Sequence, residues 1–518
     1  MADPSLFAHV RRHWAVFLGI SIALAVWCAV DVSRRAIIDP AHPGRHMTDL
    51  TVYTEAGRAF FDGREPYEVA NIRGWKYLYP PLLALVVAPL ARLSGPAQAG
   101  VWFGLSALMG FGIYFECCKL LKRSLPFKNC HADDSYGVAG PGDSGNALVP
   151  LPIWLIVAAA TAAILPALNC LQRGQMGVAL LYFLLLGYRL TVTGRSVRIW
   201  LMGGAFLSLP IALKLTPLLP VACLLFALFI SAAANRSRAR DNRQFSHAAC
   251  ATVGCIAGCV FFLVLFPGAL VGWNDNLRHL TTWYEKVATK VNDVRTEDFG
   301  GDVDSPRNQS FSNAVYRCGN WAAYQLGGGP YDNLTGKAHQ AMPMDAPAVS
   351  RALFVVRGLA VAALLCVVVR AARSKSPLLW GAAFGLASVA TLVVSPVARG
   401  HYFVLLLPAS LFMPLWLIET GRPSVARRAA IVPAVLIAAH YCLLEYAGRV
   451  GLLGIGTTLW YFAACTRIIW ETVRRASLPP FAGGSRGGVL RLDSCPDRAS
   501  PAVSETKTPS RLSPWTES

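Results

Sequence analysis

The residues best suited to chemistry lie in one polar stretch, residues 46–83, which separates two apolar parts of the chain. A connector between two membrane spans is usually short and plain, whereas this stretch is long and rich in carboxyl and aromatic side chains. A carboxylate in such a loop can serve as a general base, so the stretch indicates an active site. Its candidate residues are Asp49, Tyr53, Glu55, Tyr67, Trp75, Tyr77 and Tyr79.

Two short motifs further along the chain place polar residues at the ends of apolar runs. The motif NCLQRGQ holds Asn169 and Gln175 between two runs, and a turn with capping residues is the alternative explanation for it. The motif IALKLTP holds Lys214, which could equally be an interfacial lysine that extends its ammonium group towards water. Both motifs are therefore candidate parts of a site, each with a plain structural alternative.

Two further basic residues stand at or inside apolar runs. In SPVARGHYF, the chain breaks at Pro396 and His401 begins the next run. A histidine there could donate to a phosphate or carry a proton, or could simply lie at the membrane interface. Arg357 lies about two turns inside an apolar run, where an unpaired charge is costly. It should face other helices and bind an anion, with Glu116 or Glu445 as the alternative internal partner.

The composition shows that the elements positioning these residues are membrane helices. Of 518 residues, 54% are hydrophobic and only 15% are charged, with a mean hydropathy of +0.43, which excludes a water-soluble protein. The net charge of +19 does not indicate nucleic-acid binding, because the basic residues stand in short loops between apolar runs. The 14 cysteines lie mostly inside those runs and show no disulfide framework or metal-binding spacing. We predict neither a metal nor a cofactor.

Apolar runs of membrane-spanning length predict an all-α polytopic bundle of about twelve transmembrane helices. The runs are residues 14–30, 97–118, 151–168, 175–192, 199–213, 217–234, 248–266, 352–369, 378–394, 401–418, 429–444 and 452–470. Loops rich in arginine are predicted to face the cytoplasm, and the mixed charges of loops 31–77 and 267–347 predict an extracytoplasmic position. Residues 78–91 are short and interrupted by prolines, which predicts a re-entrant or juxtamembrane helix. We assign residues 1–470 to the membrane domain and residues 471–518 to a disordered cytoplasmic tail.

Several motifs, taken in their order along the chain, resemble glycosyltransferase family 87. They are the aspartate and tyrosine after the first span, GREPY, YPPLL, NCLQRGQ, ALKLTPLLP, NQS at residues 308–310 and SPVARGHY. The family's members are membrane mannosyltransferases of the GT-C type that take sugar from a polyprenyl-phosphate carrier. Two places depart from the family's pattern: Gly177 stands near its usual asparagine, and Ala398 with Arg399 stands where a tryptophan is usual.

The resemblance implies a base and a phosphate site. Asp49 matches the family's base in the first loop, Lys214 its lysine in KxxP, and His401 the histidine after its SP motif. We expect Asp49 and His401 to be catalytic, and Lys214, His401 and Arg357 to bind the donor phosphate. The residues expected to contact substrate are Tyr53, Glu55, Tyr67, Tyr79, Asn169, Gln175 and Asn308.

The implied reaction moves a hexose, with mannose as first choice, from polyprenyl phosphate to a lipid or glycan acceptor outside the cell membrane. One base and one displacement would invert the anomeric centre, and a lipid-phosphate donor needs no nucleotide site. One alternative is a transporter or flippase of lipid-linked sugars, which would also have a dozen spans. Another is a GT-C transferase of a different lipid-carried sugar, such as aminoarabinose or glucose.

Overall fold

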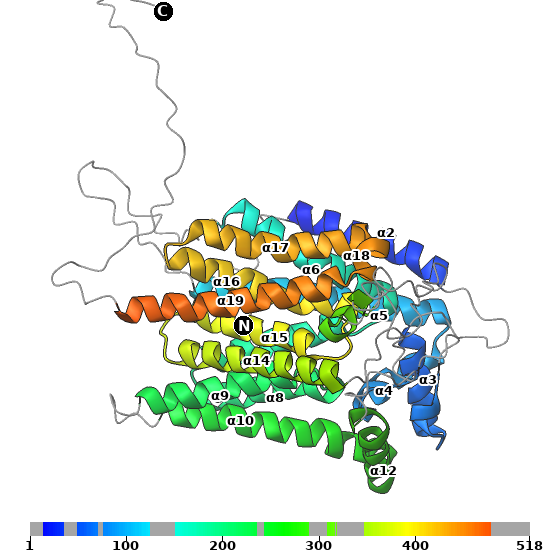
Figure 1. The fold of residues 1–518 in the computed structure, drawn as a ribbon. Helices are drawn as coiled ribbons and strands as arrows, with labels where there is room; N and C mark the ends of the chain where they lie inside the picture. The colour runs from blue at the N-terminus through cyan, green and yellow to red at the C-terminus, as the bar shows by residue number, and fades with distance from the viewer. Residues whose placement is uncertain are drawn as a thin grey trace, which may run out of the picture. The chain divides into compact units, whose positions relative to one another are not determined.

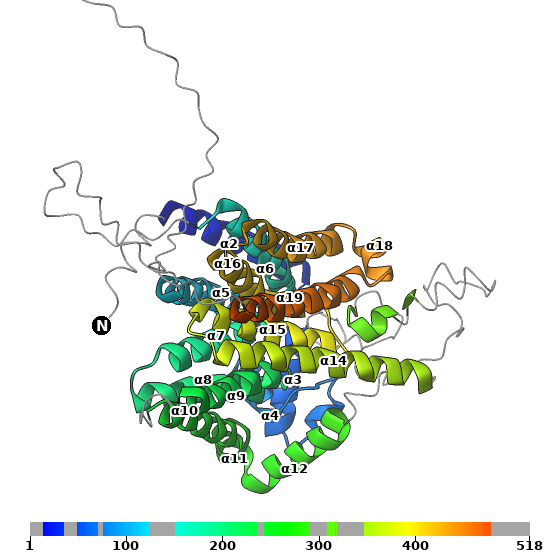
Figure 2. The ribbon, with the colours of Figure 1, turned by 60° about the vertical axis from the view of Figure 1, so that its left-hand side comes forward.

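The structure is a computed structural model that describes residues 14–35, 49–70, 76–124, 151–235, 243–289, 308–315, 317–318 and 347–477. The chain divides into two units, Met1–Leu478 and Pro479–Ser518, and all described residues belong to the first. These residues form helices joined by short turns, with two isolated β-bridges, Ala70 to Lys76 and Asn308 to Arg399 (Figure 1 and Figure 2). The predicted all-α fold is therefore confirmed.

The long helices follow the apolar runs of the sequence. They are α2 (Trp14–Arg35), α5 (Gly95–Ser124), α6 (Ile153–Arg173), α7 (Gly177–Thr193), α8 (Val197–Leu213), α9 (Leu218–Asn235), α10 (Arg243–Val260), α14 (Pro347–Ala372), α15 (Pro377–Val394), α16 (Leu407–Glu419), α17 (Pro423–Cys442) and α19 (Leu452–Ser477). Short elements are α3 (Asp49–Phe61), η1 (Pro66–Glu68), α4 (Pro81–Val87), η2 (Ala88–Arg92), η3 (Phe261–Leu265), α11 (Phe266–Val271), α12 (Trp273–Trp283), η4 (Tyr284–Ala288), η7 (Gly400–Leu406) and α18 (Leu444–Arg449).

Eight of the described helices are long and apolar enough to cross a membrane. Each coincides with one of the predicted spans, which confirms a polytopic membrane protein. The other four predicted spans coincide with shorter apolar helices, namely the apolar part of α2 and helices α7, α8 and α9. Large apolar side chains on the outer faces, including Leu108, Ile153, Ile256 and Phe354, are exposed. In water such a surface would promote aggregation, but it suits contact with lipid.

Helix α15 lies at the centre of the main core and is buried along nearly its whole length. It packs against α9, α14, α16, α19 and the η7 turn, as Figure 1 and Figure 2 show. Its start is fixed locally: the Ser376 side chain accepts a hydrogen bond from the Leu379 amide, and Pro377 occupies the first helical position. At the other end, the chain leaves α15 at Ser395 and passes directly into the SPVARGHYF motif.

The polar stretch within the predicted loop 31–77 is a folded layer in its described part. Its described part contains α3 and η1, and α4 with η2 follows as the short helix expected near residues 78–91. Buried residues of α3 and α4 share a second core with the ends of α7 and α8. Gly57 lets α3 approach α4 closely, because a Cβ there would lie 2.6 Å from the Ala84 carbonyl oxygen. Trp75 lies outside the described residues.

The second predicted loop, residues 267–347, also contains helices. Its described part includes most of α11, then α12 and η4, and residues 308–315 and 317–318. Helix α12 packs against α4 and η1, and the Lys286 ammonium lies 2.5 Å from a carboxylate oxygen of Glu68. At the far end of the chain, α19 continues past residue 471 to Ser477, so the predicted tail begins with helix. Its remainder lies outside the described residues.

Candidate active site

The first turn of α3 is held against the elbow between α6 and α7. Gly174 ends α6 in the left-handed conformation, with φ of 66°, which favours glycine. A Cβ at this position would lie 2.8 Å from the Cβ of Leu50, so glycine also permits the close contact between the elbow and α3. This contact brings Asp49, the first residue of α3, next to Gln175.

Gln175 is the centre of a buried polar network. Its Nε2 donates a short hydrogen bond to Oδ2 of Asp49. The hydroxyls of Tyr53 and Tyr79 lie 3.3 and 3.4 Å from its Oε1 and 3.2 Å from each other. The two tyrosine rings meet edge to face, with centroids 5.1 Å apart. Predicted site residues from α3, from the turn before α4 and from the α6–α7 elbow therefore form one connected group.

The surroundings of Asp49 shift the pKa of its carboxyl in opposite directions. Burial raises the pKa of its carboxyl above the ordinary value, while the Gln175 hydrogen bond and the positive charges of Arg399, Arg173 and Lys214 lower it. Asp49 also stands at the N-terminus of α3, where the helix dipole favours a negative charge. Burial raises the pKa of Tyr79 to about 12 and that of Tyr53 well above its usual range. Both hydroxyls therefore keep their protons at neutral pH.

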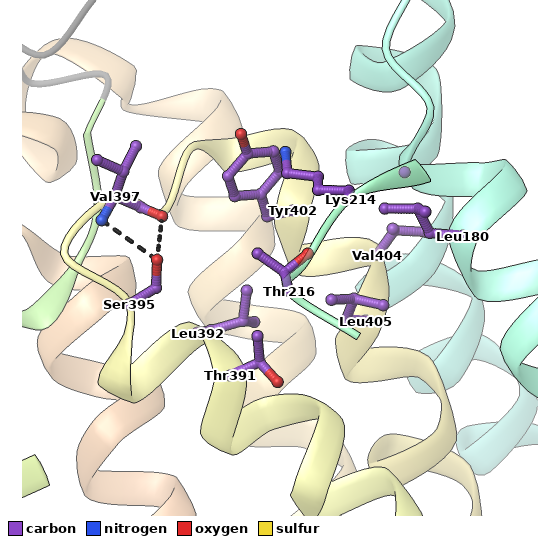
Figure 3. A pocket seen from close by; sticks show the side chains of 11 residues that line it. Leu180, Lys214, Thr216, Thr391, Leu392, Ser395, Val397, Tyr402, Val404 and Leu405 are labelled. Carbon is purple, nitrogen blue, oxygen red and sulfur yellow. Dashed lines mark hydrogen bonds between the residues drawn. The ribbon is translucent and has the colours of Figure 1, made fainter. Parts of the chain in front are cut away.

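Lys214 lies at the end of α8 and is held by aromatic rings. Its Nζ is 3.7 Å from the centroid of the Tyr402 ring and 5.1 Å from that of Tyr79, which is the geometry of a cation–π contact. Figure 3 shows Lys214 beside Tyr402 at the wall of a pocket. The pocket is lined by Gly177, Leu180, Lys214, Thr216, Thr391, Leu392, Ser395, Val397, Tyr402, Val404 and Leu405. Its volume of about 20 Å³ holds roughly one water molecule, so a sugar would require it to open.

His401 lies in the η7 turn and is almost fully buried, with 1% of its surface exposed. Neither ring nitrogen has a hydrogen-bond partner among the described residues. Its backbone carbonyl accepts a hydrogen bond of 3.3 Å from the Cys170 thiol, and η7 packs against α6, α7 and α15. The positive charges of Arg173, Lys214 and Arg399 act on this side chain as they do on Asp49. His401 therefore belongs to the same electrostatic cluster.

The side chain of Asn308 forms hydrogen bonds with the backbone of the loop that precedes His401. Its Oδ1 accepts hydrogen bonds of 3.1 Å from the backbone amides of Ala398 and Ser310, and its Nδ2 donates to the Pro396 carbonyl at 3.4 Å. A β-bridge pairs Asn308 with Arg399. The predicted substrate contact of Asn308 stays a prediction, and the structure gives this side chain a role in holding the loop.

Of four other predicted residues, Arg357, Glu55 and Asn169 lie apart from this cluster, and Tyr67 contacts it at Tyr79. Arg357 donates from Nη2 to the Ser312 hydroxyl at 2.8 Å, and no contact in the described part of the chain joins it to Lys214 or His401. Glu55 forms an ion pair of 3.2 Å with Arg58. Asn169 was expected in the polar elbow, but it lies inside α6 because that helix continues to Arg173. Tyr67 is buried, and its hydroxyl lies 3.4 Å from the Tyr79 carbonyl oxygen.

Three residues of the cluster were missed by the sequence analysis: Arg173, Arg399 and Tyr402. All three stand inside motifs that the sequence already marked, NCLQRGQ and SPVARGHYF. A basic residue within such a motif was a usable signal for Arg173 and Arg399, because the other basic clusters stand in loops predicted to face the cytoplasm. Among the described residues, no group of three or more His, Cys, Asp or Glu side chains could hold a metal ion.

The family comparison covers more than half of the chain. The sequence model described as Glycosyltransferase family 87 matches residues 77–396, a region that includes Tyr79, Gln175 and Lys214 but neither Asp49 nor His401. No curated protein and no solved structure matches the chain. Its helices and this match make it a membrane glycosyltransferase. The chain belongs to glycosyltransferase family 87.

Proposed function

We propose that the protein transfers a hexose, with mannose as first choice, from a polyprenyl-phosphate donor to a lipid or glycan acceptor. The observation that carries this proposal is the arrangement around Asp49. A buried carboxylate, oriented by Gln175, lies in the field of Lys214, Arg173 and Arg399. A base beside a cationic site matches the needs of a reaction that deprotonates a hydroxyl and releases a phosphate.

In the proposed reaction, Asp49 takes the proton from the acceptor hydroxyl as its oxygen attacks the anomeric carbon of the sugar. The bond between that carbon and the phosphate oxygen breaks at the same time, and the electron pair leaves with the polyprenyl phosphate. A single displacement of this kind inverts the anomeric centre. Asp49 then holds the proton on its carboxyl group, and burial favours this protonated form.

The donor phosphate is proposed to bind Lys214 and His401, with Arg173 and Arg399 as additional cations. Lys214 lines the pocket, and one of the unpartnered ring nitrogens of His401 can donate to an anion, because a neutral imidazole carries one N–H. A buried phosphate needs such charged or polar donors, because leaving it unpaired would cost several kcal/mol. The sequence also predicted Arg357 as a phosphate ligand, but its contact with Ser312 favours a role in packing, so we do not include it in the proposed phosphate site.

The proposed architecture is a GT-C-type domain over residues 1–470, with about twelve transmembrane helices and a cytoplasmic tail after it. Loops 31–77 and 267–347 are proposed to face the extracytoplasmic side of the cell membrane. Impermeant thiol labelling of single cysteines tests this orientation. Glu285→Cys should be labelled in intact cells and Ser374→Cys should not, and the reverse pattern would overturn the assignment.

Transfer is tested with purified protein, radiolabelled polyprenyl-phosphate sugars and a lipid extract. Wild-type protein should move label from the mannose donor into a new lipid or glycan product, and Asp49→Asn should not. Label that crosses a vesicle membrane without changing its carrier would instead show a transporter or flippase. Transfer from a glucose or aminoarabinose donor, but not from the mannose donor, would correct the sugar and keep the reaction type.

A further inference from the structure

We propose that Gln175 is a positioning residue for the base, and that Oδ1 of Asp49 is the oxygen that receives the acceptor's proton. This inference rests on the proposed function, in which Asp49 is the base. It assigns Gln175 to the carboxylate, whereas the sequence predicted a contact between Gln175 and substrate.

The orientation of the Gln175 amide follows from its neighbours. A carboxylate only accepts hydrogen bonds, so the group that faces Asp49 must be the NH₂ of the amide. The opposite end, Oε1, then faces the hydroxyls of Tyr53 and Tyr79, which can donate to it at 3.3 and 3.4 Å. Two buried hydroxyl groups therefore hold the amide in the one orientation in which it donates to Asp49.

The network also distinguishes the two oxygens of Asp49. The short hydrogen bond from Gln175 occupies Oδ2, and no hydrogen bond to Oδ1 is formed in the described part of the chain. Protonation of Oδ2 would weaken the hydrogen bond from Gln175, because a carboxyl hydroxyl is a poorer acceptor than a carboxylate oxygen, so the network favours arrival of the proton at Oδ1. A rotation of the carboxylate that exchanged the two oxygens would break the bond to Gln175.

Several groups face Asp49 and set its protonation equilibrium. They are Gln175 from the elbow, Arg173 from α6, Lys214 from the end of α8, Arg399 before η7, Tyr53 from α3 and Tyr79 before α4. Among them, Gln175 forms the direct hydrogen bond with the carboxylate. Because that bond favours the charged form, loss of the donor should raise the pKa of Asp49.

Two substitutions distinguish the role of the donor end of the Gln175 amide from that of its acceptor end. Gln175→Met keeps the length of the side chain and removes both donor and acceptor. Gln175→Glu keeps an acceptor for the two tyrosines and places a second carboxylate against Asp49. We expect the pKa of Asp49 to rise by roughly one pH unit in Gln175→Met and by more in Gln175→Glu, since like charges resist joint ionisation. The pH below which turnover falls should rise by the same number of pH units as the pKa of Asp49.

The pKa is measured by infrared titration of the protonated carboxyl band, taken as the difference between each protein and its Asp49→Asn counterpart. This readout needs no substrate, so it separates failure of the inference from failure of the proposed function. Gln98→Met is the matched control: Gln98 is equally buried and contacts Thr54 of α3, yet it does not contact Asp49. Gln98→Met should leave the pKa of Asp49 unchanged.

An unchanged pKa of Asp49 in folded Gln175→Met and Gln175→Glu would overturn the inference, and so would an equal rise in Gln98→Met. If neither Gln175 variant folds, the double variant Tyr53→Phe with Tyr79→Phe replaces them. It removes both hydroxyls that hold the amide, and the pKa of Asp49 should rise by a smaller amount. No rise in this double variant would also overturn the inference.

Discussion

Two buried carboxylates lie near opposite ends of helix α7 and are held in different ways. Near the last turns of α7, Glu116 of α5 forms a short ion pair with Arg189 and a second one of 3.1 Å with Lys119. Both of its oxygens are occupied by cations that contact them directly. Such a carboxylate holds helices α5 and α7 together and has no free oxygen to receive a proton from a substrate.

Near the start of α7, Asp49 accepts its hydrogen bond from a neutral amide, that of Gln175. Positive charges of Lys214, Arg173 and Arg399 act on it, but no direct ion pair with it is formed among the described residues. Because the carboxylate has a neutral partner, one of its oxygens stays available for a proton. Burial of a carboxylate therefore does not identify a base. A neutral partner, such as the Gln175 amide, distinguishes Asp49 from Glu116, whose partners are cations.

The largest expected effect comes from neutralising each carboxylate in turn. Asp49→Asn should lower turnover by about 10² to 10⁴, the usual contribution of a general base, while expression and donor binding stay near normal. Glu116→Gln should leave turnover per folded molecule near that of the wild type. Transfer assays on equal amounts of folded protein measure both. If Asp49→Asn keeps more than about a tenth of wild-type turnover, the base is another carboxylate, with Glu55 as the next candidate.

Glu116→Gln should lower stability more than Asp49→Asn does, which is the reverse of their effects on turnover. Glu116→Gln leaves Arg189 without its counter-charge, and breaking a buried ion pair from one side costs on the order of 3 kcal/mol. Thermal unfolding in detergent should show this loss for Glu116→Gln and a much smaller change for Asp49→Asn. The double variant Glu116→Gln with Arg189→Met removes both charges and should recover part of the loss. A double variant less stable than either single one would contradict the ion-pair explanation.

Lys214 and His401 should influence donor binding more than stability. Lys214→Met and His401→Ala should each weaken binding of the polyprenyl-phosphate donor by roughly ten- to a hundredfold, the range of a hydrogen bond to a charged group. Both should also slow transfer, because negative charge grows on the leaving phosphate. Arg357→Ala is the comparison: its contact with Ser312 predicts lower thermal stability with unchanged donor affinity.

Donor titrations on folded variants decide this point. Unchanged donor affinity and rate in both Lys214→Met and His401→Ala would reject the phosphate assignment. Weaker donor binding in folded Arg357→Ala, at normal stability, would restore Arg357 to the phosphate site.

Much of the fold could be predicted from the sequence, because membrane helices are encoded locally by long apolar runs. The predicted runs coincide with helices, and the motifs containing Gln175, Lys214 and His401 meet in space. The helical layer built from α3 and α4 could not be predicted in the same way. Its polar residues suggest a loop, and the burial of Leu50 and Tyr53 of α3 depends on contacts with Gly174 and Gln175, which are distant in sequence. Propensity and periodicity do not report such contacts.

The roles of individual site residues also could not be predicted from the sequence. Asn308 and Gln175 are both amides in short motifs, yet one holds a backbone loop and the other contacts a carboxylate. Arg357 and Arg173 are both arginines in or next to predicted spans, but only Arg173 acts on Asp49. Side-chain type is the same in each pair, so the three-dimensional partners distinguish their roles.

The smallest expected effect tests how the two ends of α3 are positioned. Gly174 and Gly63 both adopt left-handed φ values, of 66° and 67°, and lie next to the start and the end of α3. A Cβ at position 63 would meet nothing within 4 Å, whereas at position 174 it would lie 2.8 Å from the Cβ of Leu50. Alanine at either position should cost about 1–2 kcal/mol of backbone strain.

Only Gly174→Ala should also change the reaction, because its Cβ pushes the first turn of α3, and with it Asp49, away from Gln175. Small displacements of a catalytic group reduce the rate steeply, so we expect turnover to fall by roughly tenfold. Gly63→Ala should lose similar stability with unchanged turnover. Thermal unfolding and transfer assays on both variants supply the two measurements. Equal turnover in the two variants would mean that the contact between Leu50 and Gly174 does not position the base, and that Asp49 depends on its hydrogen bond to Gln175 alone.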